Sequence, residues 1–229
     1  MRATAIIPVK RFGFAKQRLL EALDRPRRAA LVKAMLADVL AATTRAERVE
    51  RVIMVTGEGR AERIALRHSR RTAAPLEVLR DPRDTGHPEA ATLGIIRAKA
   101  LGAECVALLP GDCPLLDPAE LDAALDRMRR GRVTIVPDRH GTGTNALLMS
   151  PPDAIGPAFG PDSCARHTVR ARRLGYDLAV EQLDSLALDV DTPDDLATLA
   201  EALEREPHRA PATAAELAGE DRLGDRARR

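Results

Sequence analysis

The chain has 229 residues, of which 45% are apolar and only 2% are aromatic, and it contains no tryptophan. A chain of this length can build one substantial core, which Ala, Val, Leu and Ile must fill here. The scarcity of aromatic rings argues against stacking on single-stranded nucleic acid, and a formal net charge of +2 gives no long-range attraction to DNA or membranes. We therefore predict neither a nucleic-acid partner nor a membrane partner.

The cysteines and the first residues bear on where the protein works. Three widely spaced cysteines show neither a disulfide framework nor a zinc-binding pattern. Residues 1–8 lack the long apolar stretch of a signal peptide, and no segment approaches a membrane span. The predicted location is the cytoplasm.

Short apolar runs alternate with amphipathic segments along most of the chain. The runs that predict strands are, in chain order, residues 4–9, 49–56, 76–79, 105–109, 133–136, 146–149 and 186–190. The segments that predict helices are residues 27–43, 62–68, 89–101, 118–130, 163–173 and 193–203. On the third of these helices, Leu93, Ile96 and Ala100 share one face. Strands that alternate with helices predict a three-layer α/β fold with a mostly parallel central sheet, interrupted by a less regular segment after residue 136.

The composition changes near residue 205. From there the chain is rich in Arg, Ala, Pro and Glu, and its apolar residues show no periodicity. We therefore predict one domain over residues 1–204, followed by a charged tail over residues 205–229 that is disordered or loosely helical.

A basic loop follows the first predicted strand and holds two of the four lysines in the chain. Lys10, Gly13, Lys16 and Arg18 lie in it, without the spacing of a P-loop or of a Rossmann fingerprint. Gly13 allows a close backbone approach, and compact cations suit the oxygens of a triphosphate. A solvated surface loop is the alternative, but the concentration of a scarce residue type favours nucleotide phosphate binding.

Two further loops follow the third and fourth predicted strands. Residues 81–88 end in His87 and Pro88 and either contact a nucleotide or form a simple surface loop. Asp112 follows the fourth strand, and ligands of open α/β sheets bind beyond the carboxyl ends of strands. Because Mg²⁺ prefers one or two carboxylates together with phosphate oxygens, we favour a metal ligand at Asp112 over a turn or helix-capping residue.

The late part of the chain offers groups for a small anion. Residues 137–145 supply hydroxyls and glycine N–H groups, and residues 159–167 open a predicted helix with Ser163 and His167 in its first turns. Helix N-termini attract anions, so a small phosphorylated carboxylate would fit there. The alternative is an N-capped surface helix on which His167 is a polar face residue.

Acidic residues surround the end of the last predicted strand. Asp189 and Asp191 occupy alternate strand positions and would face one way, where they could complete a metal site with Asp112. Asp191 or Thr192 is the expected N-cap of the last helix, and the acidic residues that follow would serve its dipole.

Together these segments resemble the guanylyltransferases of deazaflavin coenzyme (F-420) biosynthesis, over about residues 4–196. The segments that carry the resemblance are PVKRFGFAKQRL, LLPGDCPLL, DRHGTGTNALL, FGPDSCARH and LDVDTPDDL. The family makes an activated diphospho-guanosine from GTP and 2-phospho-L-lactate, phosphoenolpyruvate or a related acid. Its fold is that of the nucleotide-diphospho-sugar transferases, which matches the α/β prediction.

The resemblance also implies roles for single residues. Asp112 and Asp189 would hold Mg²⁺, Lys16 would face the GTP phosphates, and the phosphorylated acid would contact the residues Thr144, Gly160 and Ser163. Asp112 and Lys16 would be the catalytic groups, and the product would pass to a downstream transferase. The attacking phosphate oxygen is already ionised at neutral pH, so no general base is needed, and charge and positioning carry the reaction.

The sequence departs from the family at Glu89, where many relatives carry an Asn, and this leaves the strictness of GTP preference open. One alternative is another nucleotidyltransferase or a glycosyltransferase of the same fold, against which the segment 159–167 argues. The other is a non-catalytic nucleotide-binding protein, against which the combination of Asp112, Asp189 and Lys16 argues.

Overall fold

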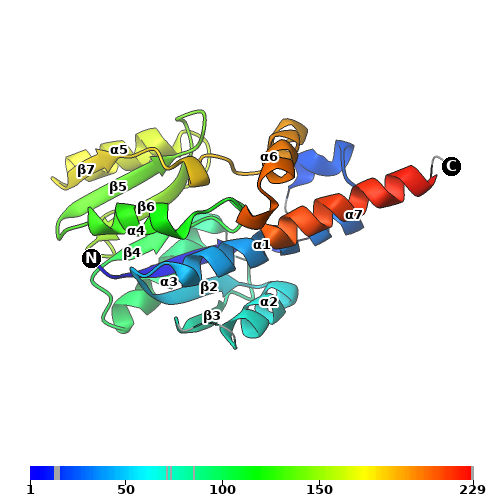
Figure 1. The fold of residues 1–229 in the computed structure, drawn as a ribbon. Helices are drawn as coiled ribbons and strands as arrows, with labels where there is room; N and C mark the ends of the chain where they lie inside the picture. Colours follow the sequence, from blue (N-terminus) through cyan, green and yellow to red (C-terminus); the bar gives the residue numbers. More distant parts are fainter. Residues whose placement is uncertain (13–15, 71, 73, 85, 228–229) are drawn as a thin grey trace.

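The structure is a computed structural model that describes residues 1–12, 16–70, 72, 74–84 and 86–227. A seven-stranded sheet with the order β3-β2-β1-β4-β6-β5-β7 forms its centre (Figure 1). The strands are β1 Ala3–Val9, β2 Val49–Thr56, β3 Leu76–Arg80, β4 Val106–Leu108, β5 Arg132–Pro137, β6 Thr144–Ser150 and β7 Asp177–Val180. Only β6 runs against its neighbours β4 and β5, which confirms the mostly parallel sheet.

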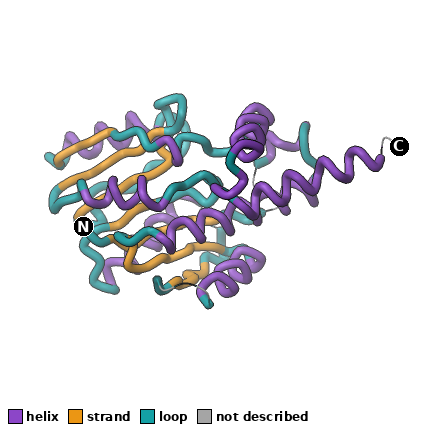
Figure 2. The backbone as a smooth tube through the Cα atoms, viewed as in Figure 1, coloured by secondary structure: helices purple, strands orange, loops and turns teal. Residues whose placement is uncertain are grey.

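Helices cover both faces of this sheet (Figure 2). One face is covered by α1 Arg25–Arg45, α2 Gly59–Ser69 and α4 Pro118–Asp126, and α6 Pro193–Arg205 and α7 Pro211–Ala227 extend this layer, where α7 packs against α1 and α6. The other face is covered by α3 His87–Ala100 and α5 Ser163–Arg173. Three 3₁₀ turns, η1 Gln17–Glu21, η2 Asp184–Leu186 and η3 Pro207–Arg209, complete the described elements. The predicted three-layer arrangement is confirmed. No helix in the described ranges is long and apolar enough to cross a membrane.

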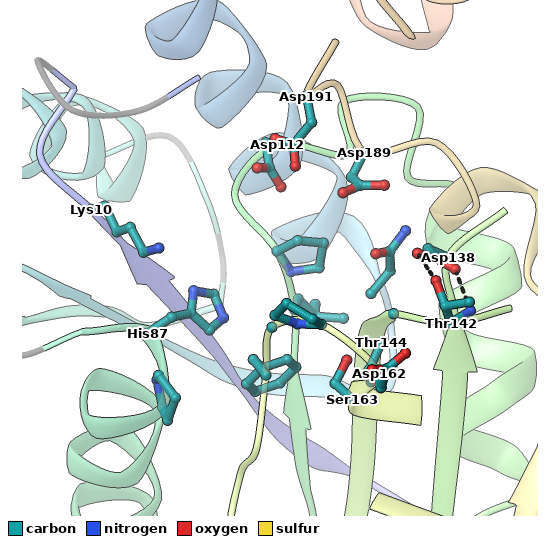
Figure 3. A pocket seen from close by; sticks show the side chains of 18 of the residues that line it. Lys10, His87, Asp112, Asp138, Thr142, Thr144, Asp162, Ser163, Asp189 and Asp191 are labelled. Carbon is teal, nitrogen blue, oxygen red and sulfur yellow. Dashed lines mark hydrogen bonds between the residues drawn. The ribbon is translucent and has the colours of Figure 1, made fainter. Parts of the chain in front are cut away.

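The reversed strand β6 has a consequence for the site. Because β6 is antiparallel to β4, its first residue, Thr144, lies at the edge of the sheet where β1, β4 and β5 end. The N-termini of α3 and α5 open toward the same edge (Figure 3). Groups that are far apart in the sequence therefore meet at the end of the sheet where α/β proteins bind ligands.

The strand predicted over residues 186–190 is wrong, and the true last strand is β7, which the sequence analysis missed. Leu186, Leu188 and Val190 are buried, so the alternating pattern marks burial correctly. No strand pairs with this segment, however. The strands β4, β6, β5 and β7 are consecutive neighbours in the sheet, so β5 already has a partner on each side. The segment instead begins at the last residue of η2 and continues without regular secondary structure into α6.

The buried face of α3 is not the predicted face of Leu93, Ile96 and Ala100, since it carries Ile95 and small residues instead. Leu93 and Ile96 are 37% and 60% exposed, and Ala100 is also exposed. The helix instead packs its small residues on the sheet, so closely that a Cβ placed on Gly94 would lie 2.3 Å from Cγ2 of Ile6. The close helix–strand approach at Gly94, together with the burial of Ile95, determines the orientation of this helix.

The tail predicted to be disordered or loosely helical forms η3 and the helix α7, which runs alongside α1 (Figure 1). Asp38 on α1 accepts hydrogen bonds from the backbone N–H groups of Ala212 and Thr213, at 3.1 and 2.8 Å, and from the Thr213 hydroxyl at 2.6 Å. A buried carboxylate at the N-terminus of a helix satisfies N–H groups that have no partner within the helix. This contact anchors the start of α7 to α1.

Candidate functional site

Two cavities at this edge of the sheet share part of their lining. The larger has a volume of about 500 Å³ and is bounded by the ends of β4 and β5, the start of β6 and the N-termini of α3 and α5. The smaller has a volume of about 240 Å³ and reaches under the first loop toward α1. Lys10, His87, Asp112 and Asp191 line both cavities, so these four side chains mark their junction.

The Lys16 ammonium group lies between two carboxylates at this junction. Its Nζ donates to Oδ2 of Asp112 and, at 2.5 Å, to Oδ1 of Asp191. The Lys16 side chain is only 6% exposed, and burial by itself would lower its pKa; the two carboxylates outweigh burial and raise the pKa. Burial likewise opposes the ionised form of Asp112, but Lys16 holds its pKa below the ordinary value. Both partners are therefore charged at neutral pH.

Asp189 lies beside this pair and lines the larger cavity (Figure 3). Burial, together with the negative charges of Asp112 and Asp191, raises its pKa to about 6. Such crowding of carboxylates is relieved by a cation, and Asp112 and Asp189 face the same cavity, as a Mg²⁺ site with two carboxylates requires. In the described part of the chain, no group of three or more His, Cys, Asp and Glu side chains is arranged to hold a metal ion. The remaining ligands of such an ion would have to come from substrate phosphates and water.

The segment that carries Asp189 and Asp191 is held by hydrogen bonds outside any strand ladder. Asn145 donates its side-chain amide to the backbone carbonyl of Leu186 at 2.6 Å, and Arg139 donates its backbone N–H to Ala187 at 3.0 Å. The next helix is fixed by a capping box, in which Thr192 is the N-cap and exchanges hydrogen bonds with the residue three positions on. These contacts place the two carboxylates without a neighbouring strand.

A row of rings lies beside the larger cavity. The ring of Phe159 meets the rings of His87 and His167 edge-on, with centroid distances of 4.7 and 5.3 Å. Burial, helped by the nearby positive charges of Lys10 and Lys16, lowers the pKa of His87 to about 4. His87 is therefore neutral at pH 7 and offers polar atoms to the cavity without adding a charge.

The opposite side of the larger cavity is formed by the start of α5 and the start of β6. Asp162, the N-cap residue of α5, has a positive φ of 53° and makes no side-chain capping hydrogen bond, so the side-chain cap that belongs to the surface-helix alternative is absent at this residue. The backbone N–H of Ser163 donates to the carbonyl of Gly160 at 3.1 Å, and Gly160 has a φ of 107°, which favours glycine. Thr144, Gly160 and Ser163 all line this cavity. The N–H groups of Ser163 and Cys164 are engaged with the carbonyls of Gly160 and Thr142, so this side offers a ligand the hydroxyl side chains of Thr144 and Ser163, which can donate to an anion.

Comparison with known proteins identifies the family. The family described as "Guanylyl transferase CofC like" matches residues 3–202. The chain belongs to this family. It is 47% identical, over 88% of each chain, to a phosphoenolpyruvate guanylyltransferase of Conexibacter woesei, and 39% identical to a 3-phospho-D-glycerate guanylyltransferase of Phenylobacterium zucineum, over 86% of this chain and 89% of the relative. The resemblance drawn from the sequence is confirmed, and the chain is a nucleotidyltransferase.

Solved structures support the fold. A protein from Desulfovibrio desulfuricans G20, assigned as a nucleotide-diphospho-sugar transferase, superposes with a TM-score of 0.74 at 20% identity over 97% of both chains. A nucleotidyl transferase from Methanothermobacter superposes with a TM-score of 0.64 at 16% identity over 89% of this chain and 98% of that chain. At these identities the likeness establishes the fold, which is the predicted nucleotide-diphospho-sugar transferase fold.

The structure of this guanylyl transferase family member brings the predicted site residues to the two cavities. Those that line one or both are Lys10, Lys16, Arg18, His87, Pro88, Asp112, Thr144, Gly160, Ser163 and Asp189. Gly13 lies outside the described residues. Asp112 does not cap a helix, because Asp117 is the N-cap of α4. What each of these residues binds stays a prediction.

Sequence reasoning missed several residues that shape the site. Asp138 accepts the backbone N–H groups of His140 and Thr142 at 3.2 and 3.0 Å, and a Cβ placed on Gly143 would lie 2.6 Å from its carboxylate. An Asp followed by two glycines is the signature of such a turn and was available in the sequence. No local pattern announces Phe159 or Asn145, whose partners are distant along the chain.

Proposed function

We propose that this protein transfers GMP from GTP to the phosphate of a small phosphorylated acid, phosphoenolpyruvate or 2-phospho-L-lactate, and releases pyrophosphate, as a step of coenzyme F-420 biosynthesis. The observation that carries the proposal is the junction of the two cavities, where Lys10, His87, Asp112 and Asp191 face both. A reaction that joins two anions needs two adjacent pockets with cations between them. The names of the curated relatives support guanylyl transfer to a phosphorylated acid.

The distribution of charge suggests which substrate lies where. Lys10 and Lys16 are contributed by the first loop and line the smaller cavity, which also has an apolar wall of Val32 and Leu36 from α1. Compact ammonium groups beside an apolar wall suit the triphosphate and ribosyl part of GTP. The donors near Thr144 and Ser163 line the far side of the larger cavity, where the acid would bind.

The chemistry follows from this arrangement. An oxygen of the acid's phosphate attacks the α-phosphorus of GTP, a new P–O–P linkage forms, and the bond from the α-phosphorus to the pyrophosphate oxygen breaks. Both the nucleophile and the leaving group are anions, so no proton has to be removed from the nucleophile. Lys16 and Lys10 offset the negative charge that gathers at the junction, and the pocket walls hold the reacting atoms in line.

We also propose Mg²⁺ as the cofactor. Asp112 and Asp189 would hold it, since both carboxylates face the larger cavity, and burial together with the charges of Asp112 and Asp191 raises the pKa of Asp189, which a bound cation would offset. When bound, the ion would neutralise phosphate oxygens at the reacting centre. Because the Lys16 ammonium already contacts Asp112 and Asp191, Lys16 would share Asp112 with the ion or turn toward the triphosphate.

The proposed product is an activated diphosphate, which would pass to a downstream transferase in the cytoplasm. The two curated relatives described above act on different acids by name, so 3-phospho-D-glycerate belongs among the substrates to test. Glu89, the departure from the family pattern, is exposed in the first turn of α3, so each of the four nucleoside triphosphates should be tested as well.

The test measures pyrophosphate release from purified protein with Mg²⁺, one nucleoside triphosphate and one acid at a time. The downstream transferase is added as a trap, because the activated product can decompose. We expect release with GTP and one of the three acids, and none with EDTA. Pyrophosphate release that is independent of any acid, or that proceeds better with a sugar phosphate, would overturn the proposed acceptor.

A further inference from the structure

We propose that His167 is a positioning residue for acceptor recognition, although it lines neither of the two cavities of the site. The inference rests on the proposed function. His167 fixes the hydroxyl of Thr144 as a hydrogen-bond donor that points into the larger cavity, toward an anionic oxygen of the phosphorylated acid. It also holds the loop of residues 158–161, which forms the wall beside that hydroxyl.

The first step is the protonation state of the ring. His167 on α5 is fully buried, and its Nε2 lies 2.8 Å from the backbone nitrogen of Ala158. A backbone N–H is always a donor, so Nε2 must be the unprotonated acceptor. Burial, followed by the positive charges of Arg170 and Arg166, lowers the pKa of His167 to about 4, and the ring is therefore neutral. A neutral ring whose Nε2 is an acceptor carries its proton on Nδ1.

The second step concerns the hydroxyl of Thr144, whose hydrogen-bonding role follows from the position of the proton on His167. Nδ1 of His167 lies 3.0 Å from Oγ1 of Thr144, and because it carries the proton, it donates to that oxygen. A hydroxyl that accepts one hydrogen bond from a protein group still has its own hydrogen to give. Thr144 is buried at the start of β6 and lines the larger cavity, so its remaining hydrogen is available to a ligand there. The hydroxyl is thus set to receive an acceptor atom, such as a phosphate or carboxylate oxygen.

The third step concerns the neighbouring loop. While His167 accepts the N–H of Ala158, the guanidinium of the adjacent Arg166 donates to the carbonyls of Ala158 at 2.7 Å, of Phe159 at 3.3 Å, and of Pro161. Two consecutive residues of α5 therefore hold one loop from both its N–H and its carbonyl groups. The Phe159 ring, which also lines the cavity, packs edge-on against His167. The imidazole therefore sets the hydroxyl donor and supports the wall beside it.

The test separates the two ring nitrogens by substitution. The side-chain amide of Asn reaches the position of Nδ1 and that of Gln reaches the position of Nε2. His167→Asn can therefore still donate to Thr144, whereas His167→Gln can only accept the N–H of Ala158. We expect His167→Gln to raise KM for phosphoenolpyruvate about 10- to 100-fold, the range for losing a hydrogen bond to a charged group. KM for GTP should stay within about threefold, and His167→Asn should raise KM for phosphoenolpyruvate less than His167→Gln does.

Variants of Thr144 distinguish a positioning role of His167 from a role in stability alone. Thr144→Val should raise KM for phosphoenolpyruvate as much as His167→Gln does, whereas Thr144→Ser should keep this KM near that of wild type. The Thr144→Val/His167→Gln double variant should have a KM no higher than that of either single variant. Additive effects, or an equal rise of KM for GTP, would overturn the proposal. Val169→Gln, on the exposed side of the same helix, is the matched control and should behave as wild type.

A spectroscopic measurement keeps the inference testable if these variants fold poorly or if the acid is another compound. Nitrogen-15 NMR of the unmodified protein distinguishes the two neutral imidazole tautomers, and the signal that disappears in His167→Asn identifies the residue. We expect His167 to carry its proton on Nδ1 at pH 7. A proton on Nε2 would refute the geometry regardless of activity, whereas an Nδ1 proton in a protein inactive with every acid would count against the proposed function alone.

Discussion

The contact between Lys16 and the two carboxylates allows a quantitative prediction for Lys16→Met. Methionine follows the lysine side chain as far as Cε and lacks the ammonium group, so it removes the charge together with the two hydrogen bonds that Nζ donates. The Lys16 side chain is 6% exposed, but the side chains of its partners Asp112 and Asp191 are 31% and 49% exposed. The substitution therefore leaves two adjacent carboxylates without their cation, in a position that water partly reaches.

The expected loss of stability is small. Breaking a fully buried ion pair costs about 3–5 kcal/mol, but solvent screens carboxylates as exposed as these, so we expect about 1–2 kcal/mol. For a chain of this size, that loss lowers Tm by about 2–8 °C. The expected loss of activity is much larger, because a cation at the transition state contributes about 10²- to 10³-fold to kcat.

The assay combines thermal melts, with and without Mg²⁺, with pyrophosphate release from GTP and phosphoenolpyruvate. In Lys16→Met the two freed carboxylates should bind cations better, so Mg²⁺ should raise Tm more than it does in wild type. Lys33→Met, which removes an exposed lysine of α1, is the control and should change neither quantity. Turnover of Lys16→Met within about threefold of wild type would refute a catalytic charge at Lys16, since the loss expected for that role is far larger.

Three further predictions address single contacts. Asp112→Asn should lower turnover about 100-fold or more while Tm changes by only a few degrees; near-normal turnover would remove Asp112 from the metal role. His167 has a folded pKa of about 4 and an unfolded pKa of about 6.5. The unfolded chain therefore binds more protons between these values, and the free energy of unfolding should fall as pH drops from 6.5 to 4, by on the order of 3 kcal/mol. Urea titrations should show a smaller fall in His167→Asn, and an equal fall would contradict the low pKa. Asp38→Ala removes the cap of α7 and should cost about 2 kcal/mol, seen as a lower Tm with kcat unchanged; a melting curve like that of wild type would show that α7 does not depend on this cap.

The fold was predictable where local pattern and global pairing agree. The strand over residues 49–56 and the helix over residues 163–173 have their predicted bounds, because the first is a short apolar run buried on both faces of the sheet and the second is a segment that opens with Ser163 and carries polar residues on its exposed side. The pattern of apolar residues, however, indicates which residues are buried and does not indicate which segments pair as strands. Leu186, Leu188 and Val190 are buried without forming a strand, because the strand positions beside their segment are already occupied. The same limit applies to α3, whose packing depends on the close approach of Gly94 to β1.

The candidate site was predictable in its residues but not in its contacts. The rule that ligands bind beyond strand ends singled out Lys16, Asp112 and Asp189, which the structure brings to the two cavities. The contact of Lys16 with Asp191 joins positions 175 residues apart, and nothing local announces it. His167 read as a polar face residue, because the role of an imidazole depends on the partners of its two nitrogens, which only the folded chain supplies.

The most direct test of the central claim follows the α-phosphorus itself. Purified protein is incubated with Mg²⁺, phosphoenolpyruvate and GTP labelled at the α-phosphate, and the products are separated at short times, with Asp112→Asn as the control. Transfer of GMP predicts label in a new diphosphate that contains both guanosine and the acid, formed in step with pyrophosphate and absent with Asp112→Asn. Label that stays in GTP, or that appears only in free GMP while wild-type protein releases pyrophosphate, would contradict the account.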